Sequence, residues 1–321
     1  MKMVMVTGAN GFTGRAICAY LRDKGYPVRG TVREGGNPGD RTDMKSNAVV
    51  GDLLGEPDWS AALDGVDTIV HLAGMAHVLR ETEGNSSAIY RQVNTLGTQR
   101  LAQAAVEAGV RRFVFTSTIV VNGISTPESP FRESDPVNPY GPYGKSKWDA
   151  EQSLLAIAAE SGLETVVLRP PLMYGPGVKG NFLRLLHWVR RGAPLPLAGV
   201  KNQRSFLGIE NFASLIDRCI AHPSAAGEIF LVSDGDNLST PGLIKKLAQL
   251  MNRPARLFPM PSAVLGAMAR LTGQSQAWQR LGGSLVVDAK KCRQLLEWHP
   301  PFTVNEGLRE MVEWFMNRPK E

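Results

Sequence analysis

A tyrosine and a lysine stand four residues apart in the segment Tyr143-Gly144-Lys145-Ser146-Lys147. On a helix this spacing puts both side chains on one face. A phenol titrates near ~10 and an ammonium near ~10.4, and a close ammonium lowers the pKa of a phenol by about 1–3. We therefore expect Tyr143 to exchange protons nearer neutral pH, as a general acid–base group does. The same spacing also occurs on solvated helix faces, so the motif needs a supporting context.

Hydroxyl side chains just upstream supply that context. The apolar run Phe113-Val114-Phe115 reads as a strand and ends in Thr116-Ser117-Thr118. Hydroxyls at the end of a strand in a parallel sheet face the ligand crevice. One of them could hold a substrate oxygen beside Tyr143. The two clusters together predict a proton-transfer site.

Three glycines spaced three apart follow the first apolar run of the chain. Val4 to Val6 lead into Thr7-Gly8-Ala9-Asn10-Gly11-Phe12-Thr13-Gly14, and apolar residues then recur at helical spacing. Strand, tight turn and helix are predicted. The glycines let the backbone approach a pyrophosphate, and the helix N-terminus attracts that anion. The commoner dinucleotide fingerprint is Gly-x-Gly-x-x-Gly, so this spacing is a variant of it.

Further strands alternate with helices along the chain. Strands are expected at 28–32, 48–53, 67–72, 111–117, 163–168 and 228–232, and a long helix at 90–108. This alternation predicts a doubly wound parallel (Rossmann) sheet with ligands at the carboxyl ends of its strands. We expect a dinucleotide-binding domain at 1–170 and a smaller C-terminal α/β substrate domain at 171–321, with segments near 204–235 returning to the first. His71 is expected to be a core histidine rather than a catalyst.

The end of the second strand bears on the choice of cofactor. An NAD site places an acidic residue there for the ribose 2′-OH, whereas an arginine accommodates the 2′-phosphate of NADP. Val32 stands at that position and Arg33 follows, which favours NADP(H); Glu34 could still be the ribose ligand of NAD(H). Asp52 could accept from the adenine amino group or cap the segment at 57–63.

The composition limits the other classes of protein. The 321 residues are 43% hydrophobic, enough for a sizeable core, and the net charge of +6 is a mild, scattered excess. It suits anionic small molecules better than nucleic acid. Cys18, Cys219 and Cys292 have neither disulfide nor metal spacing, which indicates a reducing cytoplasm and no metal. We expect no signal peptide and no membrane span.

These motifs together resemble the extended short-chain dehydrogenase/reductases, and most closely the nucleotide-sugar 4-epimerases, 4-ketoreductases and dehydratases. The resemblance covers nearly the whole chain. It rests on the glycine turn, His71 to Gly74, Asn94, the hydroxyl cluster, the Tyr143 to Lys147 motif, the run 168–177 and Asp288-Ala-Lys-Lys. It implies a UDP-sugar substrate and a homodimer.

The resemblance also assigns roles to residues. In the family the catalytic hydroxyl lies five residues before a glycine, here Gly123, which selects Thr118 over its neighbour Ser117. Lys147 is then expected to bond the nicotinamide ribose. The implied cofactor contacts are Gly8, Asn10, Gly11, Phe12, Thr13, Gly14, Arg33, Asp52, Leu53, Leu72, Ala73, Gly74, Asn94, Thr116, Tyr143, Lys147 and Pro170. Asn181, Phe182 and Arg204 match positions at the substrate diphosphate, with Arg280 a second arginine candidate.

Three departures narrow the expected activity. Ile119-Val120 replaces the Asp-Glu pair of 4,6-dehydratases, which argues against a dehydratase. Asn122 stands where a tyrosine is common, and Val32-Arg33 resembles a segment of NADPH-dependent reductases. We expect hydride transfer at C4 of a UDP-hexose or UDP-N-acetylhexosamine, with 4-keto reduction favoured over 4-epimerisation. Leu172 and Met173 are expected to restrict the sugar pocket.

Two other functions remain as alternatives. A non-catalytic NADPH-sensing protein would keep the nucleotide fold, but such proteins often lose the Tyr-Lys pair that is intact here. A reductase of a steroid or flavonoid ketone would have no diphosphate to pair with Asn181 and Arg204. Both alternatives are therefore less favoured than a UDP-sugar enzyme.

Overall fold

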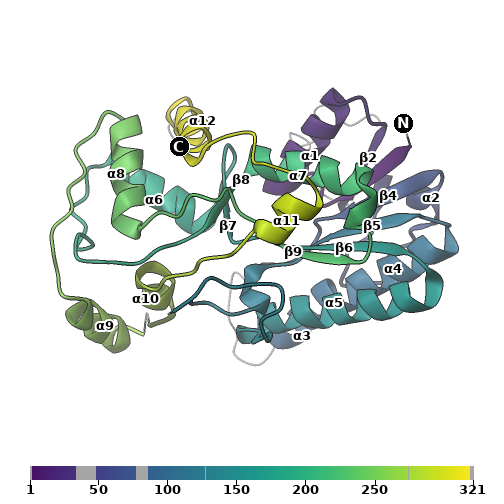
Figure 1. Ribbon diagram of the computed structural model, residues 1–321, viewed down its shortest axis with the longest axis horizontal. Coiled ribbons are helices and arrows are strands. Elements are labelled where there is room, and N and C mark those ends of the chain that lie inside the picture. The colour runs from purple at the N-terminus through teal and green to yellow at the C-terminus, as the bar shows by residue number, and fades with distance from the viewer. Residues whose placement is uncertain (1, 34–47, 77–85, 127, 274, 319–321) are drawn as a thin grey trace.

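The computed structural model describes residues 2–33, 48–76, 86–126, 128–273 and 275–318 (Figure 1). A central sheet with helices on both faces forms one part of the molecule, and a smaller, mainly helical part lies beside it (Figure 1). None of the described helices has the length and apolarity needed to cross a membrane.

All seven strands of the main sheet run parallel. Their order is β3-β2-β1-β4-β5-β6-β9. The bounds are β1 (Met3–Thr7), β2 (Val28–Arg33), β3 (Ala48–Val50), β4 (Val66–His71), β5 (Arg112–Thr116), β6 (Glu164–Arg169) and β9 (Glu228–Leu231). The strand order reverses between β1 and β4, and a ligand crevice forms at the carboxyl ends beside such a reversal. The predicted Rossmann sheet is confirmed.

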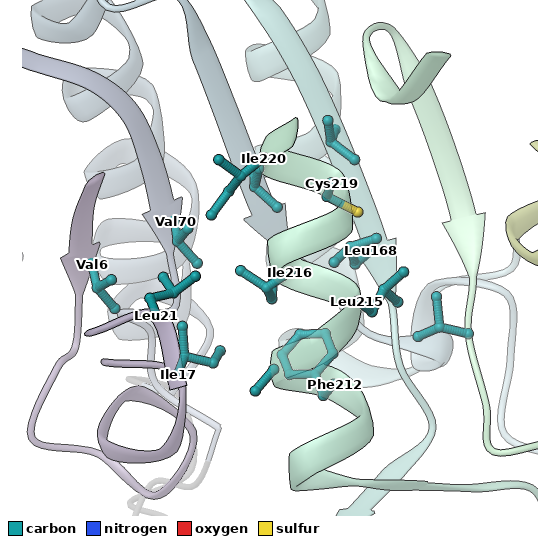
Figure 2. Packing of buried hydrophobic residues seen from close by; sticks show 14 of the residues in the cluster. Val6, Ile17, Leu21, Val70, Leu168, Phe212, Leu215, Ile216, Cys219 and Ile220 are labelled. Carbon is teal, nitrogen blue, oxygen red and sulfur yellow. The ribbon is translucent and has the colours of Figure 1, made fainter. Parts of the chain in front are cut away.

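Two hydrophobic cores cover the faces of this sheet. On one face α1 (Phe12–Asp23) and α7 (Ile209–Ala221) pack against the strands through residues such as Ile17, Leu21 and Phe212 (Figure 2). On the other face lie α4 (Gly97–Glu107) and α5 (Gly141–Ser161). Alternate residues of β5 point to opposite cores, because successive side chains of a strand face opposite ways.

The helix predicted at 90–108 forms, but its start is not a regular α-helix. The chain forms α3 (Ser86–Tyr90), then a π-helical turn (Arg91–Leu96), and only then α4. The backbone N–H of Gly97 donates to Gln92 five residues back. Thr95 donates through its hydroxyl to the carbonyl of Ser146 on α5, so a tertiary contact holds the wider turn. π-Helical turns of this kind often occur at functional sites.

The smaller part has its own core. Its strands β7 (Leu172–Tyr174) and β8 (Phe206–Gly208) pair in parallel. Three helices, α6 (Gly180–Arg190), α8 (Thr240–Leu250) and α12 (Val304–Met316), pack around Tyr174 and Phe182. The remaining elements are α2 (Ser60–Leu63), α9 (Ser262–Leu271), α10 (Ser275–Gly282), α11 (Lys290–Leu295) and 3-10 turns at Ile119–Val121 and Pro223–Ala225.

Candidate active site

The glycine turn packs as closely as its spacing predicts. Gly8 has φ of +67°, and a Cβ added there would lie 3.1 Å from the Cα of Ala73. A Cβ on Gly14 would come within 2.1 Å of the Gly8 carbonyl oxygen, so only glycine fits. Helix α1 begins at Phe12 without a side-chain cap or an acidic residue in its first turn. Its first N–H groups therefore remain available to an anion.

A hydrogen-bonded chain of buried side chains fixes the adjacent end of β4. The N–H groups of Leu72 and Ala73 both donate to the hydroxyl of Thr7, at 3.1 Å each. That hydroxyl must then donate its own hydrogen to Nδ1 of His71, 2.7 Å away. Nε2 of His71 therefore carries the ring hydrogen and donates to Thr98, 3.0 Å away.

His71 is thus a neutral core residue, as predicted. Burial, with a smaller contribution from the charge of Lys147, lowers its pKa to about 3. Its ring packs between Phe113 and Phe115 of β5. A proton-transfer role for His71 is therefore not supported, since the ring holds one tautomer with both nitrogens engaged.

The hydroxyl, phenol and amine predicted to act together do meet at the end of β5. Thr118 caps the 3-10 turn that follows the strand, accepting from the N–H of Val120 at 3.3 Å. Its side chain is hydrogen-bonded to Tyr143 in the first turn of α5. Lys147 follows one turn later, buried, with Nζ 4.0 Å from the ring centroid of Phe115.

The expected effect of Lys147 on Tyr143 is wrong for this structure. Burial raises the pKa of Tyr143 to about 12, and the nearby Tyr90 adds to the rise, although the hydrogen bond with Thr118 lowers it. Burial also lowers the pKa of Lys147 to about 7, against the raising effect of Glu151. The desolvation of both groups therefore outweighs the stabilisation of a phenolate by an ammonium.

A second buried cluster lies beneath these groups. Glu151 on α5 accepts a short hydrogen bond from the hydroxyl of Ser117 and two from Arg169 at the end of β6. Arg169 also donates to Oδ1 of Asn122 at 3.0 Å. This buried clamp, formed by Ser117, Asn122, Glu151 and Arg169, joins α5 to the ends of β5 and β6. Glu151 and Arg169 were not predicted to belong to the site, although the spacing 143, 147, 151 places Glu151 on the same helix face as Tyr143 and Lys147.

The structure also fits a dinucleotide beside this site. Oγ1 of Thr116 is buried and has no hydrogen-bond partner among the described residues, so it lacks an acceptor or donor that a ligand would supply. Pro170 closes the same edge, where its carbonyl accepts from the N–H of Ile119 at 3.0 Å. Three features of this edge therefore fit a bound dinucleotide: the closely packed glycine turn, the uncapped start of α1 and the unpaired hydroxyl of Thr116.

Several predicted cofactor residues have structural partners of their own. Asn94 exchanges hydrogen bonds with both backbone groups of Met75 and donates to Ser146, so it fastens the turn after β4, including Gly74, to α5. The side chain of Leu53 is buried beneath Gly97. Contact of Leu53 with a ligand is therefore left to its backbone.

The capping role considered for Asp52 is wrong. Its carboxylate accepts from the N–H of Leu54 at 3.0 Å and so closes its own turn. The segment before α2 is instead fastened by Asp58, which accepts from the N–H of Ser60 at 2.9 Å. Asp52 lies exposed just past the carboxyl end of β3.

The predicted substrate residues divide into three groups. Asn181 is exposed in the first turn of α6. The Phe182 side chain is buried between Tyr174 and Phe206, so its ring cannot line a diphosphate and only its backbone remains for that role. Arg204 is half-buried and donates to the carbonyl of Gly283 at 2.9 Å.

Two of the predicted arginines cannot be placed beyond the backbone. Arg33 ends β2 and Arg280 belongs to α10, but the side chains of both lie outside the described part of the structure, as does all of Glu34. Val32 is half-buried against the core under α1. Met173 packs against the same core, which removes it from the expected wall of a sugar pocket, whereas Leu172 is exposed.

Comparison with known proteins extends over the whole chain. The model of the NAD dependent epimerase/dehydratase family matches residues 4–233. A UDP-glucose 4-epimerase of Vibrio cholerae is 38% identical across 98% of this chain and 96% of its own. A 2-alkyl-3-oxoalkanoate reductase of Stenotrophomonas maltophilia (strain K279a) is 30% identical across 96% and 98%. The structure of MoeE5 in complex with UDP-glucose and NAD matches with a TM-score of 0.76 at 26% identity, covering 98% of both chains.

Proposed function

We propose, since this chain belongs to the NAD dependent epimerase/dehydratase family of NAD(P)-dependent enzymes, that it transfers a hydride at C4 of a UDP-linked hexose or N-acetylhexosamine. The observation that carries the proposal is the placement of Thr118 beside the phenol of Tyr143, with the buried Lys147 one turn further along α5. These three groups lie at the carboxyl end of β5, next to the orphan hydroxyl of Thr116. The V. cholerae relative and the UDP-glucose complex of MoeE5 support a UDP-sugar as the substrate.

Each residue of the site has a defined task in this proposal. A bound NAD(P) supplies or accepts the hydride. Thr118 holds the sugar O4, because the neighbouring hydroxyl of Ser117 is already committed to Glu151. Tyr143 gives a proton to O4 or removes it. Lys147 would hold the ribose of the bound nicotinamide cofactor.

The glycine turn and the smaller part of the molecule provide the binding contacts. Gly8, Gly11 and the start of α1 would hold the diphosphate of the cofactor. The substrate diphosphate meets Asn181, the backbone of Phe182, Arg204 and Arg280. Arginine suits a diphosphate because its guanidinium binds two oxygens at once.

We propose 4-keto reduction as the direction of the reaction. A phenol whose pKa is about 12 is protonated at neutral pH and can donate to a ketone oxygen at once. Oxidation of a 4-hydroxyl requires the phenolate instead. Val32 and Arg33 point the same way, since a reductase exchanges its cofactor each turnover and no acid stands at position 32 to hold the ribose of NAD. NADP(H) is therefore the proposed cofactor.

The second candidate is 4-epimerisation with a retained NAD. It is favoured by the 38% identity to the V. cholerae UDP-glucose 4-epimerase. It gains further support from Met173, a partly buried residue that packs against the core and so is not proposed to narrow the space in which a 4-keto sugar would turn over. Ile119 and Val120 stand where a dehydratase has acidic residues, so dehydration is not proposed.

Two incubations test the proposal. With a UDP-4-keto-6-deoxy-hexosamine we expect stoichiometric oxidation of added NADPH, followed by absorbance. With UDP-glucose and no added cofactor we expect little or no UDP-galactose, followed by NMR of the C4 configuration. Rapid interconversion, with NAD released from the denatured protein, would replace the reductase by the epimerase. If the protein reduced a 2-alkyl-3-oxo acid but acted on no UDP-sugar, both the 4-ketoreductase and the 4-epimerase would be excluded.

The resemblance to extended short-chain enzymes adds two coarser proposals. We propose that the protein is a homodimer, which sedimentation velocity measures directly. We also propose that it acts in the cytoplasm, where its three buried cysteines would stay reduced.

A further inference from the structure

The net positive charge of this chain is not scattered, as expected from the composition, but arises from one segment. Residues 237–287 contain six Lys/Arg and no Asp or Glu. This basic segment accounts for the whole net charge of +6, and the rest of the chain carries 30 residues of each sign. Lys245, Arg253, Arg256 and Arg270 have exposed side chains. The segment spans α8, α9 and α10, in the part of the molecule away from the main sheet (Figure 1).

Helix α9, in the middle of this basic segment, exposes an apolar stripe. Val264, Met268 and Leu271 follow one another at helical spacing and are 45%, 52% and 89% exposed. Phe258, in the loop before the helix, is also exposed. Isolated apolar residues are common on surfaces, but a contiguous row on one helix face marks an interaction site.

The opposite face of α9 is already used by the fold. Leu265 packs against the core of the smaller part together with Trp278 of α10. A Cβ added at Gly266 would lie 3.3 Å from the indole nitrogen of Trp278, so the two helices are in close contact. Helix α9 therefore contacts the rest of the described chain through this opposite face, and the exposed stripe is a separate surface.

We infer that α9 docks this enzyme on the surface of an anionic phospholipid bilayer. An apolar stripe on a helix whose sequence segment is basic and free of acidic residues is the pattern of a helix that lies in the membrane interface. Val264, Met268 and Leu271 would enter the boundary of the acyl chains. Arg253, Arg256 and Arg270 would meet the lipid phosphates, whose negative surface potential attracts basic segments. This inference goes beyond the proposed reaction and does not depend on it.

Charge complementarity favours a bilayer over the other occupants. A two-fold dimer through α9 would place two copies of the same acid-free segment face to face, because such an interface uses the same patch on both chains. Like charges would then oppose association. A nucleic acid would neutralise the cations but would leave the apolar stripe in water. A bilayer with anionic headgroups satisfies both features.

Vesicle sedimentation tests the inference. The whole protein should bind vesicles of phosphatidylcholine with phosphatidylglycerol, and bind vesicles of phosphatidylcholine alone much less. The double variant Met268→Glu/Leu271→Glu should bind the anionic vesicles about tenfold more weakly. Met316→Glu, a matched change of an exposed methionine on α12, should bind as the unchanged protein does. Circular dichroism checks that both variants fold.

A second variant tests the electrostatic part. Arg253→Gln/Arg256→Gln should weaken binding to anionic vesicles at low salt, and added salt should weaken binding of the unchanged protein in the same way. Turnover of soluble substrate should stay the same in all these variants. Absence of binding, or equal binding to both vesicle types, would overturn the inference. So would a concentration-dependent dimer that the double glutamate variant abolishes while vesicles do not bind.

Discussion

Glu151 and Arg169 form an ion pair whose closest atoms are 2.5 Å apart, with the two side chains 0% and 2% exposed. One belongs to the helix that carries Tyr143 and Lys147, and the other ends the strand beside Thr118. A buried pair of this kind is costly to break, because removal of one partner leaves the other charge unpaired inside the protein. The pair therefore holds the candidate catalytic groups at a fixed separation.

Arg169→Met should lower the free energy of unfolding by about 3–5 kcal/mol, since Glu151 then stays buried without its counter-charge. Urea unfolding measures the change. Lys145→Met is the matched control, because it breaks the exposed pair with Asp149 on the same helix and should cost less than about 0.5 kcal/mol. Equal losses in the two variants would show that burial of the pair is unimportant. Glu151→Leu/Arg169→Met should recover part of the loss.

Tyr143→Phe should reduce kcat by roughly 10²–10⁴-fold, because the phenol supplies or removes the O4 proton. Cofactor affinity, measured by titration, should change little. Tyr140→Phe removes a hydroxyl three residues earlier, outside the candidate catalytic set, and serves as the control. Turnover near that of the unchanged protein in Tyr143→Phe would remove this residue from the mechanism.

The buried amine of Lys147 should make stability depend on pH. Its pKa is about 7 in the folded protein and 10.5 in the unfolded chain, so between these values the unfolded chain binds more protons. This group therefore destabilises the folded state fully below pH 7, and the penalty falls as pH rises. Lys147→Met should gain stability over the unchanged protein near pH 6 and lose that advantage by up to ~1.4 kcal/mol per pH unit above pH 7.

Thermal or urea unfolding of both proteins from pH 6 to pH 9 measures this difference. Lys145→Met, which removes an exposed lysine from the same helix, controls for the loss of a side chain. A stability difference between Lys147→Met and the unchanged protein that is constant across this range would contradict the lowered pKa.

Arg33→Ala should weaken NADPH by about 10–100-fold and NADH far less, because a hydrogen bond to a charged 2′-phosphate is worth ~1.5–3 kcal/mol. Fluorescence titration with both cofactors gives the ratio. Lys24→Ala, at the end of α1, removes a cation at a distance from the glycine turn and is the control. Equal weakening of the two cofactors would rule out the phosphate contact.

Local patterns were sufficient to predict the sheet and the position of Tyr143 and Lys147 on one helix face. The glycine spacing from Gly8 to Gly14 and the Tyr143–Lys147 spacing are short-range signals, and each is tied to one backbone geometry. Burial of a side chain by segments distant in the sequence could not be predicted from such short-range patterns. Nothing in the sequence shows that desolvation would raise the pKa of Tyr143 rather than lower it, because that depends on which segments cover the ring.

The misplaced predictions share a physical cause. The family resemblance places Phe182 at the substrate diphosphate, but its aromatic ring packs on Tyr174 instead of facing an anion. The π-helical turn at Arg91–Leu96 depends on the hydroxyl contact from Thr95 to a helix 51 residues away. Tertiary partners of this kind override local helix propensity.

The position of β9 in the sequence determines when the main sheet can be completed as the chain is synthesised. β9 pairs with β6, yet β7, α6, β8 and α7 come between them in the chain. A nascent chain that ends near residue 170 lacks both β9 and α7, so Val6, Ile17 and Leu21 have no cover from Phe212 and Ile216 (Figure 2). The nucleotide-binding half therefore matures only after much of its neighbour has left the ribosome. Until then it exposes apolar side chains of the kind that make folding intermediates prone to aggregate.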